Sequence, residues 1–193
     1  MGKQKQKIQA NEKMQANEKM RANEKGKTNE RLQSNEKTQV AQDRKLYIAY
    51  GSNLNIKQMA KRCPTAEVIC KSTLEGYRLL FRGDKNHAVA TVEPQDGGKV
   101  PVLIWSITPK DEAALDRYEA FPSLYRKENI TIEIGGKPFE GMIYIMNVEY
   151  EYKQVRQENT PHPHYYAIIR EGYKDAGFDM EILKNATPKK WDF

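Results

Sequence analysis

Residues 46–55 have the sequence Leu46-Tyr47-Ile48-Ala49-Tyr50-Gly51-Ser52-Asn53-Leu54-Asn55, and this passage decides how the fold is interpreted. Its first five residues are an apolar and aromatic run of the length of a buried β-strand. Gly51-Ser52-Asn53 is turn chemistry that ends the strand, and residues 55–63 suit a short helix. A glycine turn before a helix exposes consecutive backbone N–H groups, which attract an anion. The passage therefore predicts either a site for a substrate carboxylate or an ordinary capped turn.

The β-type runs downstream predict a sheet built largely from sequential strands. Strands are expected at 66–81 (interrupted near Gly76), 87–93, 100–107, 125–134 and 137–147. The last two are joined by Gly135-Gly136, a clear hairpin signal. Because strands outnumber helices and are partly linked by hairpins, the sequence predicts the α+β class, with a small curved or barrel-like mixed β-sheet and flanking helices.

The helices of this domain are marked by their ends. Thr108-Pro109-Lys110-Asp111 starts a helix, because threonine is a good N-cap, proline fits the first helical position and acidic side chains favour the positive end of the helix dipole. That helix should run to about Ala120. A further helix is expected over 161–177, closed by Gly177, and a short one over 179–185.

The first 44 residues differ in composition from the rest. They carry eleven Lys and Arg against six Asp and Glu, and no aromatic residue, so they account for most of the net charge of +6. Residues 9–38 repeat every six positions as variants of Gln-Ala-Asn-Glu-Lys-Met, a period that does not return to one helix face. We therefore expect a disordered or weakly helical tail over 1–44 and a folded domain over 45–193. The interleaved glutamates leave at most a weak nucleic-acid contact through the tail.

The composition also bears on the cellular compartment. No apolar stretch approaches the roughly eighteen residues of a membrane span, and the N-terminus lacks the apolar centre of a signal peptide. Gln6 stands where a myristoylation signal requires Ser or Thr. Cys63 and Cys70 supply no disulfide framework. We expect a cytoplasmic protein without membrane contact.

Common cofactor and metal motifs do not occur in the chain. His87, His162 and His164 are scattered, and the last two lack the helical spacing of a zinc-binding helix. The sequence contains neither a phosphate-loop pattern nor GxGxxG or GxSxG. Cys63 and Cys70 suit ordinary packed thiols better than nucleophiles. We expect no cofactor and no metal.

Glu119 is the carboxylate with the best claim to chemistry. It lies four residues after Leu115, near the apolar stripe that includes Tyr118, and in the last helical turn, where the dipole opposes negative charge. Partial burial and that dipole would both raise the pKa of its carboxyl group, as a general acid/base near neutral pH requires. The alternative is a half-exposed carboxylate that pairs with Arg117 or Lys127.

Together these features resemble the γ-glutamyl cyclotransferase family. Tyr47-Ile48-Ala49-Tyr50-Gly51-Ser52-Asn53-Leu54 resembles its opening motif. Its catalytic helix and the following strand resemble Leu115-Asp116-Arg117-Tyr118-Glu119 and Tyr125-Arg126. Its late strand resembles Tyr144-Ile145-Met146, and its closing helix resembles the run from Pro163 through Tyr165-Tyr166, Ile168-Ile169 and Gly172 to Gly177. The resemblance covers about residues 46–186 and keeps the family's order.

The resemblance implies a barrel-like α+β fold, a cofactor-free reaction and a set of site residues. Glu119 would be the catalytic carboxylate. The implied substrate-binding residues are Tyr50, Gly51, Ser52, Asn53, Leu54, Tyr125 and Tyr144, with the loop at 51–54 holding the γ-glutamyl group largely through backbone N–H groups. The chain departs from the family at Ala120, where glycine is frequent. If that position needs a positive φ, alanine is strained there.

The implied reaction releases 5-oxoproline and a free amine, amino acid or peptide from a small γ-glutamyl compound. The α-amine of the substrate is already tethered to its own γ-carbonyl, so the enzyme has to supply orientation and proton transfer rather than a nucleophile. Glutathione-derived γ-glutamyl amino acids, γ-glutamyl amines and crosslinked γ-glutamyl-lysine all share the tethered part. Two alternatives stay open: a non-catalytic small-molecule-binding module, and an interaction protein that acts through its basic repeat tail.

Overall fold

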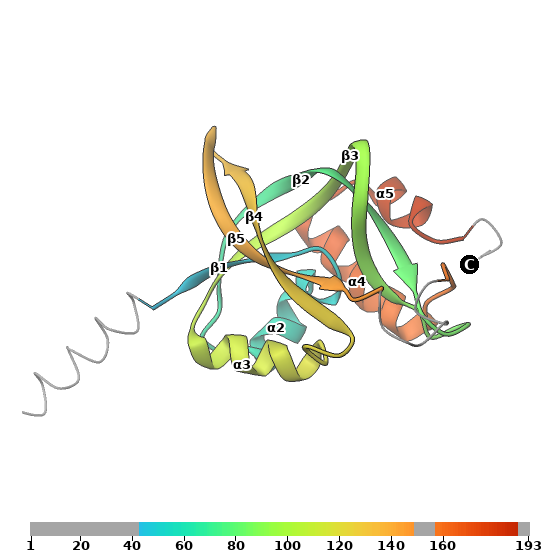
Figure 1. Ribbon diagram of the computed structural model, residues 1–193, viewed down its shortest axis with the longest axis horizontal. Helices are drawn as coiled ribbons and strands as arrows, with labels where there is room; N and C mark the ends of the chain where they lie inside the picture. The colour runs from blue at the N-terminus through green and yellow to red at the C-terminus, as the bar shows by residue number, and fades with distance from the viewer. Residues whose placement is uncertain (1–42, 149–156, 189–193) are drawn as a thin grey trace, which may run out of the picture. The chain divides into compact units, whose positions relative to one another are not determined.

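The computed structural model describes residues 43–148 and 157–188, and the expected tail lies outside them apart from its last two residues. The described chain forms five strands and a set of short helices (Figure 1). The strands are β1 (Lys45–Ala49), β2 (Glu67–Arg82), β3 (Val89–Ile107), β4 (Tyr125–Ile134) and β5 (Lys137–Met146). The helical elements are η1 (Ser52–Leu54), α2 (Ile56–Arg62), α3 (Pro109–Tyr118), α4 (Pro163–Ala176) and α5 (Met180–Asn185).

The sheet is mixed and has the strand order β2-β3-β1-β5-β4. The short strand β1 is central: it runs antiparallel to β3 and parallel to β5. The edge strands β2 and β4 approach each other, since the Ser72 hydroxyl donates to the Glu133 carbonyl over 2.7 Å. The curved sheet and its flanking helices confirm the predicted α+β class, and no strand pairing closes the sheet within the described residues.

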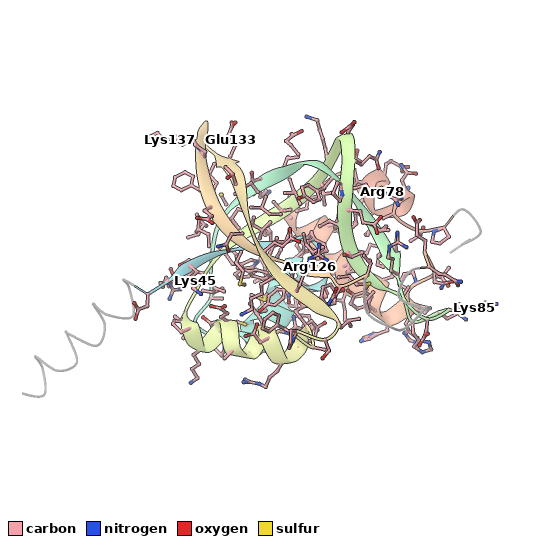
Figure 2. The ribbon with its side chains drawn as sticks, in the orientation of Figure 1. Lys45, Arg78, Lys85, Arg126, Glu133 and Lys137 are labelled. Atoms are coloured by element: carbon pink, nitrogen blue, oxygen red, sulfur yellow. The ribbon has the colours of Figure 1, made fainter. Side chains whose placement is uncertain are left out.

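The hairpin predicted at Gly135-Gly136 joins β4 to β5, and both glycines have positive φ. Figure 2 shows Glu133 and Lys137 on either side of this tip, at the end farthest from the helices. The two strands expected at 87–93 and 100–107 are instead one strand, β3. Glu75 pairs with Lys99 but Tyr77 pairs with Pro94, so residues 95–98 bulge out opposite Gly76. The irregularity expected near Gly76 therefore interrupts the pairing without ending either strand.

Helix α3 begins where its sequence predicts. The Thr108 hydroxyl accepts a hydrogen bond from the Asp111 N–H, and the Asp111 carboxylate accepts one from the Thr108 N–H, which completes a capping box. The helix ends at Tyr118, earlier than expected, and Glu119 is its C-cap. The physical reason is Ala120, whose φ of 49° turns the chain out of the helix.

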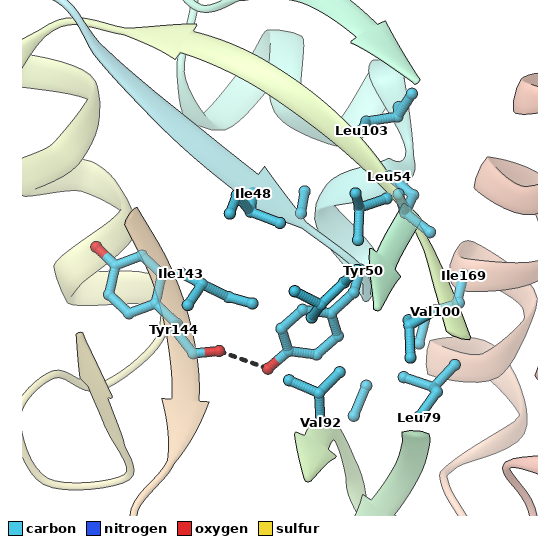
Figure 3. Close-up of a cluster of buried hydrophobic side chains, with 14 of the residues drawn as sticks. Ile48, Tyr50, Leu54, Leu79, Val92, Val100, Leu103, Ile143, Tyr144 and Ile169 are labelled. Atoms are coloured by element: carbon cyan, nitrogen blue, oxygen red, sulfur yellow. Dashed lines mark hydrogen bonds between the residues drawn. The ribbon is translucent and has the colours of Figure 1, made fainter. Parts of the chain in front are cut away.

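The core is formed where the strands cross near β1. Figure 3 shows Ile48 of β1, Ile143 of β5 and Val100 of β3 within one cluster, with Ile169 of α4 at its side. All four are fully buried. At the exit of β1, the Tyr50 hydroxyl donates to the Tyr144 carbonyl over 2.6 Å. The residue that opens the predicted binding loop is thereby fixed to the neighbouring strand.

Helix α4 packs directly against the backbone of the loop that follows β1. A Cβ atom at Gly172 would lie 2.8 Å from the Leu54 carbonyl carbon and 2.9 Å from the Asn55 nitrogen. Glycine is required there by this close approach, since backbone atoms cannot rotate away as a side chain can. The closing helix thus sets the position of the loop.

Removal of residues 1–43 is expected to leave the melting temperature and turnover of the domain unchanged. The folded unit begins at Arg44, whose guanidinium donates to the Ser106 hydroxyl over 2.7 Å and to the Thr65 carbonyl over 2.6 Å. The cut should therefore keep Arg44, one residue earlier than the boundary expected from sequence. Thermal melting and a turnover assay of the 44–193 fragment check this, and a melting point several degrees lower would contradict it.

Within residues 43–148 and 157–188, none of the helices is long and apolar enough to cross a membrane.

Candidate active site

A cavity opens where the turn after β1 meets the end of α3. Half of its lining residues are tyrosines, and the lining residues are Tyr47, Tyr50, Gly51, Ser52, Asn53, Ala90, Glu119, Tyr125, Tyr144 and Tyr165. The structure thus brings together all but one of the residues that the sequence singled out, from the turn after β1, from η1, β4 and β5, and from the end of α3. Segments more than 90 positions apart in the chain meet in this space.

Leu54 is the exception. Its side chain is fully buried in the core, and its backbone N–H donates to the Gly51 carbonyl over 3.0 Å. That N–H is consequently used within the turn and is not free for a substrate. Leu54 lies behind the loop, next to Gly172 of α4, and its expected part in substrate binding stays a prediction.

Glu119 projects into the cavity from the end of α3. Its backbone N–H still bonds to the Leu115 carbonyl over 2.8 Å, while its Oε1 accepts a hydrogen bond from Asn53 Nδ2 over 2.8 Å. Burial raises the pKa of the Glu119 carboxyl to about 7, although Arg62 and the bond from Asn53 both act to lower it. Near neutral pH this carboxyl is therefore divided between its acidic and basic forms.

The alternative prediction, in which Glu119 pairs with Arg117 or Lys127, is wrong in the case of Lys127. The Lys127 ammonium binds Glu112 over 2.6 Å and Asp116 over 2.8 Å, both of which precede Glu119 on α3. Within the described residues no ion pair joins Glu119 to Arg117. Glu119 is thus held by an amide and shielded by aromatic rings.

The side chains of the loop are fully engaged around Glu119. Asn53 Nδ2 donates a second hydrogen bond to the Tyr47 hydroxyl over 2.7 Å, and its Oδ1 accepts one from Arg62. The Ser52 hydroxyl lies 2.9 Å from the Tyr118 hydroxyl. The N–H groups of Ser52 and Asn53 begin the turn, and no acceptor for them is found among the described residues. Both residues line the cavity, so these N–H groups are candidate donors to a bound substrate.

The tyrosines of the cavity are neutral groups whose hydroxyls are tied to the scaffold. Tyr125 donates to the Ala90 carbonyl over 2.6 Å, and Tyr144 donates to the Asp116 carboxylate over 2.6 Å. Burial raises the pKa of Tyr125 well above its ordinary value, and burial together with Asp116 does the same for Tyr144. These phenols stay protonated at neutral pH, so Glu119 is the lining group with a proton to exchange.

Sequence reasoning missed Arg62, Tyr118 and Tyr165. The Arg62 guanidinium stacks on the Tyr118 ring with its carbon 3.2 Å from the ring centroid. The Tyr165 hydroxyl accepts a hydrogen bond from the Ala90 N–H over 3.3 Å. No local signal marks the first, which is an ordinary basic residue in the last turn of a short helix. Tyr165 lay inside the quoted closing-helix fragment, where its tyrosine pair was the available signal.

Ala120 has the positive φ that its position requires. Its φ of 49° lies in the left-handed region, which alanine adopts at a cost of roughly 1 kcal/mol. The Leu124 N–H donates to the Ala120 carbonyl over 2.9 Å, so the turn is formed in spite of the substitution. Glu119 therefore keeps a defined place next to a strained residue.

The described residues contain no cluster of three or more His, Cys, Asp or Glu side chains able to hold a metal ion.

A family model described as gamma-glutamyl cyclotransferase, AIG2-like, matches residues 47–167. The gamma-glutamylcyclotransferase of Homo sapiens is 28% identical over 149 residues, which cover 70% of this chain and 73% of that protein. That of Mus musculus is 28% identical over 158 residues, covering 76% and 80%.

Solved structures share the fold. One described as a gamma-glutamyl cyclotransferase superposes with a TM-score of 0.63 at 24% identity and covers 78% of this chain and 92% of that one. A yeast cyclotransferase described as specific to glutathione gives a TM-score of 0.52 at 10% identity, covering 75% and 97%. At these identities the likeness concerns the fold.

Proposed function

The chain belongs to the γ-glutamyl cyclotransferase, AIG2-like family and is a γ-glutamyl cyclotransferase-like enzyme, and we propose that it releases 5-oxoproline from a γ-glutamyl compound without a cofactor. The observation that carries this proposal is the carboxyl of Glu119, partly buried beside the Gly51–Asn53 turn with a pKa of about 7. The departing group is a free amine, amino acid or peptide. Cys63 and Cys70 are free thiols, which suits the reducing cytoplasm proposed for the enzyme.

The first step is removal of a proton from the substrate's α-ammonium by ionised Glu119. The freed α-nitrogen attacks the γ-carbonyl carbon and closes a five-membered ring, a reaction that needs orientation because both groups belong to one molecule. The carbonyl oxygen becomes an oxyanion. The N–H groups of Ser52 and Asn53, which have no acceptor among the described residues, would stabilise this charge or bind the glutamyl carboxylate.

The second step expels the amine. Protonated Glu119 gives its proton to the leaving nitrogen as the old C–N bond breaks, and the lactam is 5-oxoproline. Overall, two protons pass from the α-nitrogen to the leaving nitrogen, and Glu119 carries them one at a time. A carboxyl whose pKa is about 7 is suited to both directions of transfer near neutral pH.

A panel of γ-glutamyl compounds tests the proposal. It should contain γ-glutamyl amino acids, glutathione, γ-glutamyl alkylamines and ε-(γ-glutamyl)lysine, with 5-oxoproline as the measured product. Release from at least one class is expected, and the class identifies the leaving group. A folded protein that binds such compounds but releases no 5-oxoproline from any of them would instead support the non-catalytic binding module.

The pH dependence of kcat/KM is expected to show an acid limb near pH 7. Glu119 must be ionised to take the first proton, and burial raises the pKa of its carboxyl to about 7 from an ordinary value of 4.5. Activity should therefore fall as the pH drops below 7, rather than below about 4.5. Steady-state rates between pH 5 and 9 measure the limb, and full activity retained at pH 5 would exclude Glu119 as the base.

Activity is expected to survive EDTA and to need no added nucleotide. The chemistry proposed for Glu119 uses proton transfer and orientation alone, and the sequence contains neither zinc-helix spacing nor a phosphate loop. Rates before and after dialysis against EDTA check this. Activity that returns after Zn²⁺ or Mn²⁺ is added to a stripped sample would contradict it.

A further inference from the structure

We propose that Arg62 is a positioning residue for Glu119, an inference that rests on the proposed function. Arg62 ends α2, and its Nη1 donates a hydrogen bond to Asn53 Oδ1. Asn53 in turn donates to Glu119 Oε1 over 2.8 Å. Arg62 thus acts on the carboxylate through the Asn53 side chain.

The role of Arg62 follows from the two ends of the Asn53 amide. An amide has a donor end and an acceptor end, and a rotation of 180° exchanges them. In the observed orientation the acceptor oxygen faces the guanidinium, and the donor nitrogen faces the carboxylate and the Tyr47 hydroxyl. The rotated amide would place its N–H groups against a cation and its oxygen against Glu119. Arg62 therefore selects the orientation that supports the carboxylate.

Arg62 is itself held in place by the end of α3. Its guanidinium carbon lies 3.2 Å from the centroid of the Tyr118 ring, and the Tyr118 hydroxyl lies 2.9 Å from Ser52 Oγ. Because Ser52 and Asn53 are adjacent, these contacts close a ring: Asn53, Arg62, Tyr118 and Ser52. The ring ties the binding turn, α2 and α3 together beside Glu119. Lysine at position 62 would lose the stacking contact with Tyr118, because its ammonium group is not planar.

Arg62 is also the cation that acts on Glu119 among the described residues. The other titratable groups that line the cavity are neutral phenols: Tyr47 of β1, Tyr50 of the turn, Tyr125 of β4, Tyr144 of β5 and Tyr165 of α4. Burial raises the pKa of Glu119, and the positive charge of Arg62 is the main influence that lowers it, ahead of the Asn53 bond. Without Arg62 both lowering influences weaken together.

The test is the variant Arg62→Met, with Lys61→Met as its control. Lys61 is the exposed neighbour in the same helical turn, so its loss removes a charge without touching Asn53. The Glu119 carboxyl is titrated by infrared difference spectroscopy, each protein against its own Glu119→Gln counterpart. This readout needs no substrate, so it decides the role of Arg62 even if no γ-glutamyl compound is ever turned over.

The expected result is a rise of about one unit in the Glu119 pKa of Arg62→Met and no change in Lys61→Met. From about 7, such a rise would lower the ionised fraction at pH 7 roughly fivefold, so kcat/KM should fall by at least that factor there and recover toward pH 9. In an Asn53→Ala background the added effect of Arg62→Met should be smaller, since the intermediary is gone.

Three results would overturn the proposal. One is an unchanged Glu119 pKa in Arg62→Met, with any loss of kcat/KM equal at every pH, which would show a purely structural role. Another is an equal shift in Lys61→Met, which would show a general charge effect. The third is a shift of the Glu119 pKa by Arg62→Met that is as large in the Asn53→Ala background as in the wild type. If Arg62→Met does not fold, Arg62→Leu takes its place, because it also removes both the charge and the donor to Asn53, and its Glu119 pKa should again rise.

Discussion

Glu119→Gln is expected to lower kcat by on the order of 10²–10⁴ or more while leaving substrate binding largely intact. The change is nearly isosteric, and the glutamine Oε1 can still accept the hydrogen bond that Asn53 Nδ2 now gives to the carboxylate over 2.8 Å. What is lost is the group that exchanges a proton. Release of 5-oxoproline measures kcat, and calorimetric titration measures binding of the same substrate.

The matched control is Glu128→Gln, whose carboxylate lies outside the cavity and pairs with Arg126. It should turn over at close to the wild-type rate.

Thermal melting of Glu119→Gln shows whether a loss of activity comes from lost chemistry or from a lost fold. Burial raises the folded-state pKa of Glu119 to about 7, so the ionised carboxyl destabilises the fold above pH 7, and this penalty disappears on acidification toward pH 4.5. At pH 8 the Glu119→Gln protein should therefore melt at a temperature no lower than that of the wild type. Near-normal turnover by Glu119→Gln would refute the mechanism.

Gly172→Ala is expected to lower turnover by about 100-fold, although the residue lies outside the cavity. The new methyl group would meet the Leu54 carbonyl carbon at 2.8 Å and the Asn55 nitrogen at 2.9 Å, which are backbone atoms. The turn that carries Asn53 must therefore shift. A shift of about 1 Å at a reacting centre lowers the rate by about 100-fold. The overpacking costs about 1–3 kcal/mol, partly offset by the roughly 1 kcal/mol that alanine gains over glycine in a helix.

Ala167→Ser is the control for this variant, because it adds one heavy atom at an exposed position of the same helix. Thermal melting and 5-oxoproline release should be unchanged in it. A Gly172→Ala protein with wild-type kcat would show that α4 does not set the position of the turn.

Much of the fold could be predicted because its signals are local. The β1 run, the Thr108 cap, the Gly135-Gly136 hairpin and the Gly177 stop each depend on a few adjacent residues, and the structure confirms all of them. The division of β3 into two strands was wrong for a related reason. Pro94 and the glycines after it interrupt the pattern locally, whereas the long partner strand β2 keeps both halves in one ladder.

Residues of the candidate site could be predicted where they are adjacent in sequence, but not where they depend on contacts between distant segments. Residues 50–53 lie together in sequence, and Glu119 is marked by its place on one helix. Arg62 has meaning only because α2 brings it over Tyr118 and next to Asn53, and nothing in its own neighbourhood encodes that contact. Leu54 was assigned to the site because it continues the motif. Its side chain is directed into the core, and a turn hydrogen bond already uses its N–H.

The most direct measurement of the central claim follows the α-nitrogen of the substrate. A γ-glutamyl compound labelled with ¹⁵N at the α-amine is incubated with the enzyme, and the products are identified by mass spectrometry. Attack by the tethered amine predicts that the label is found in 5-oxoproline, that the departing amine is unlabelled, and that Glu119→Gln forms neither product at an appreciable rate. Labelled glutamate in place of labelled 5-oxoproline would show that water, not the α-amine, attacks the γ-carbonyl, and would contradict the account.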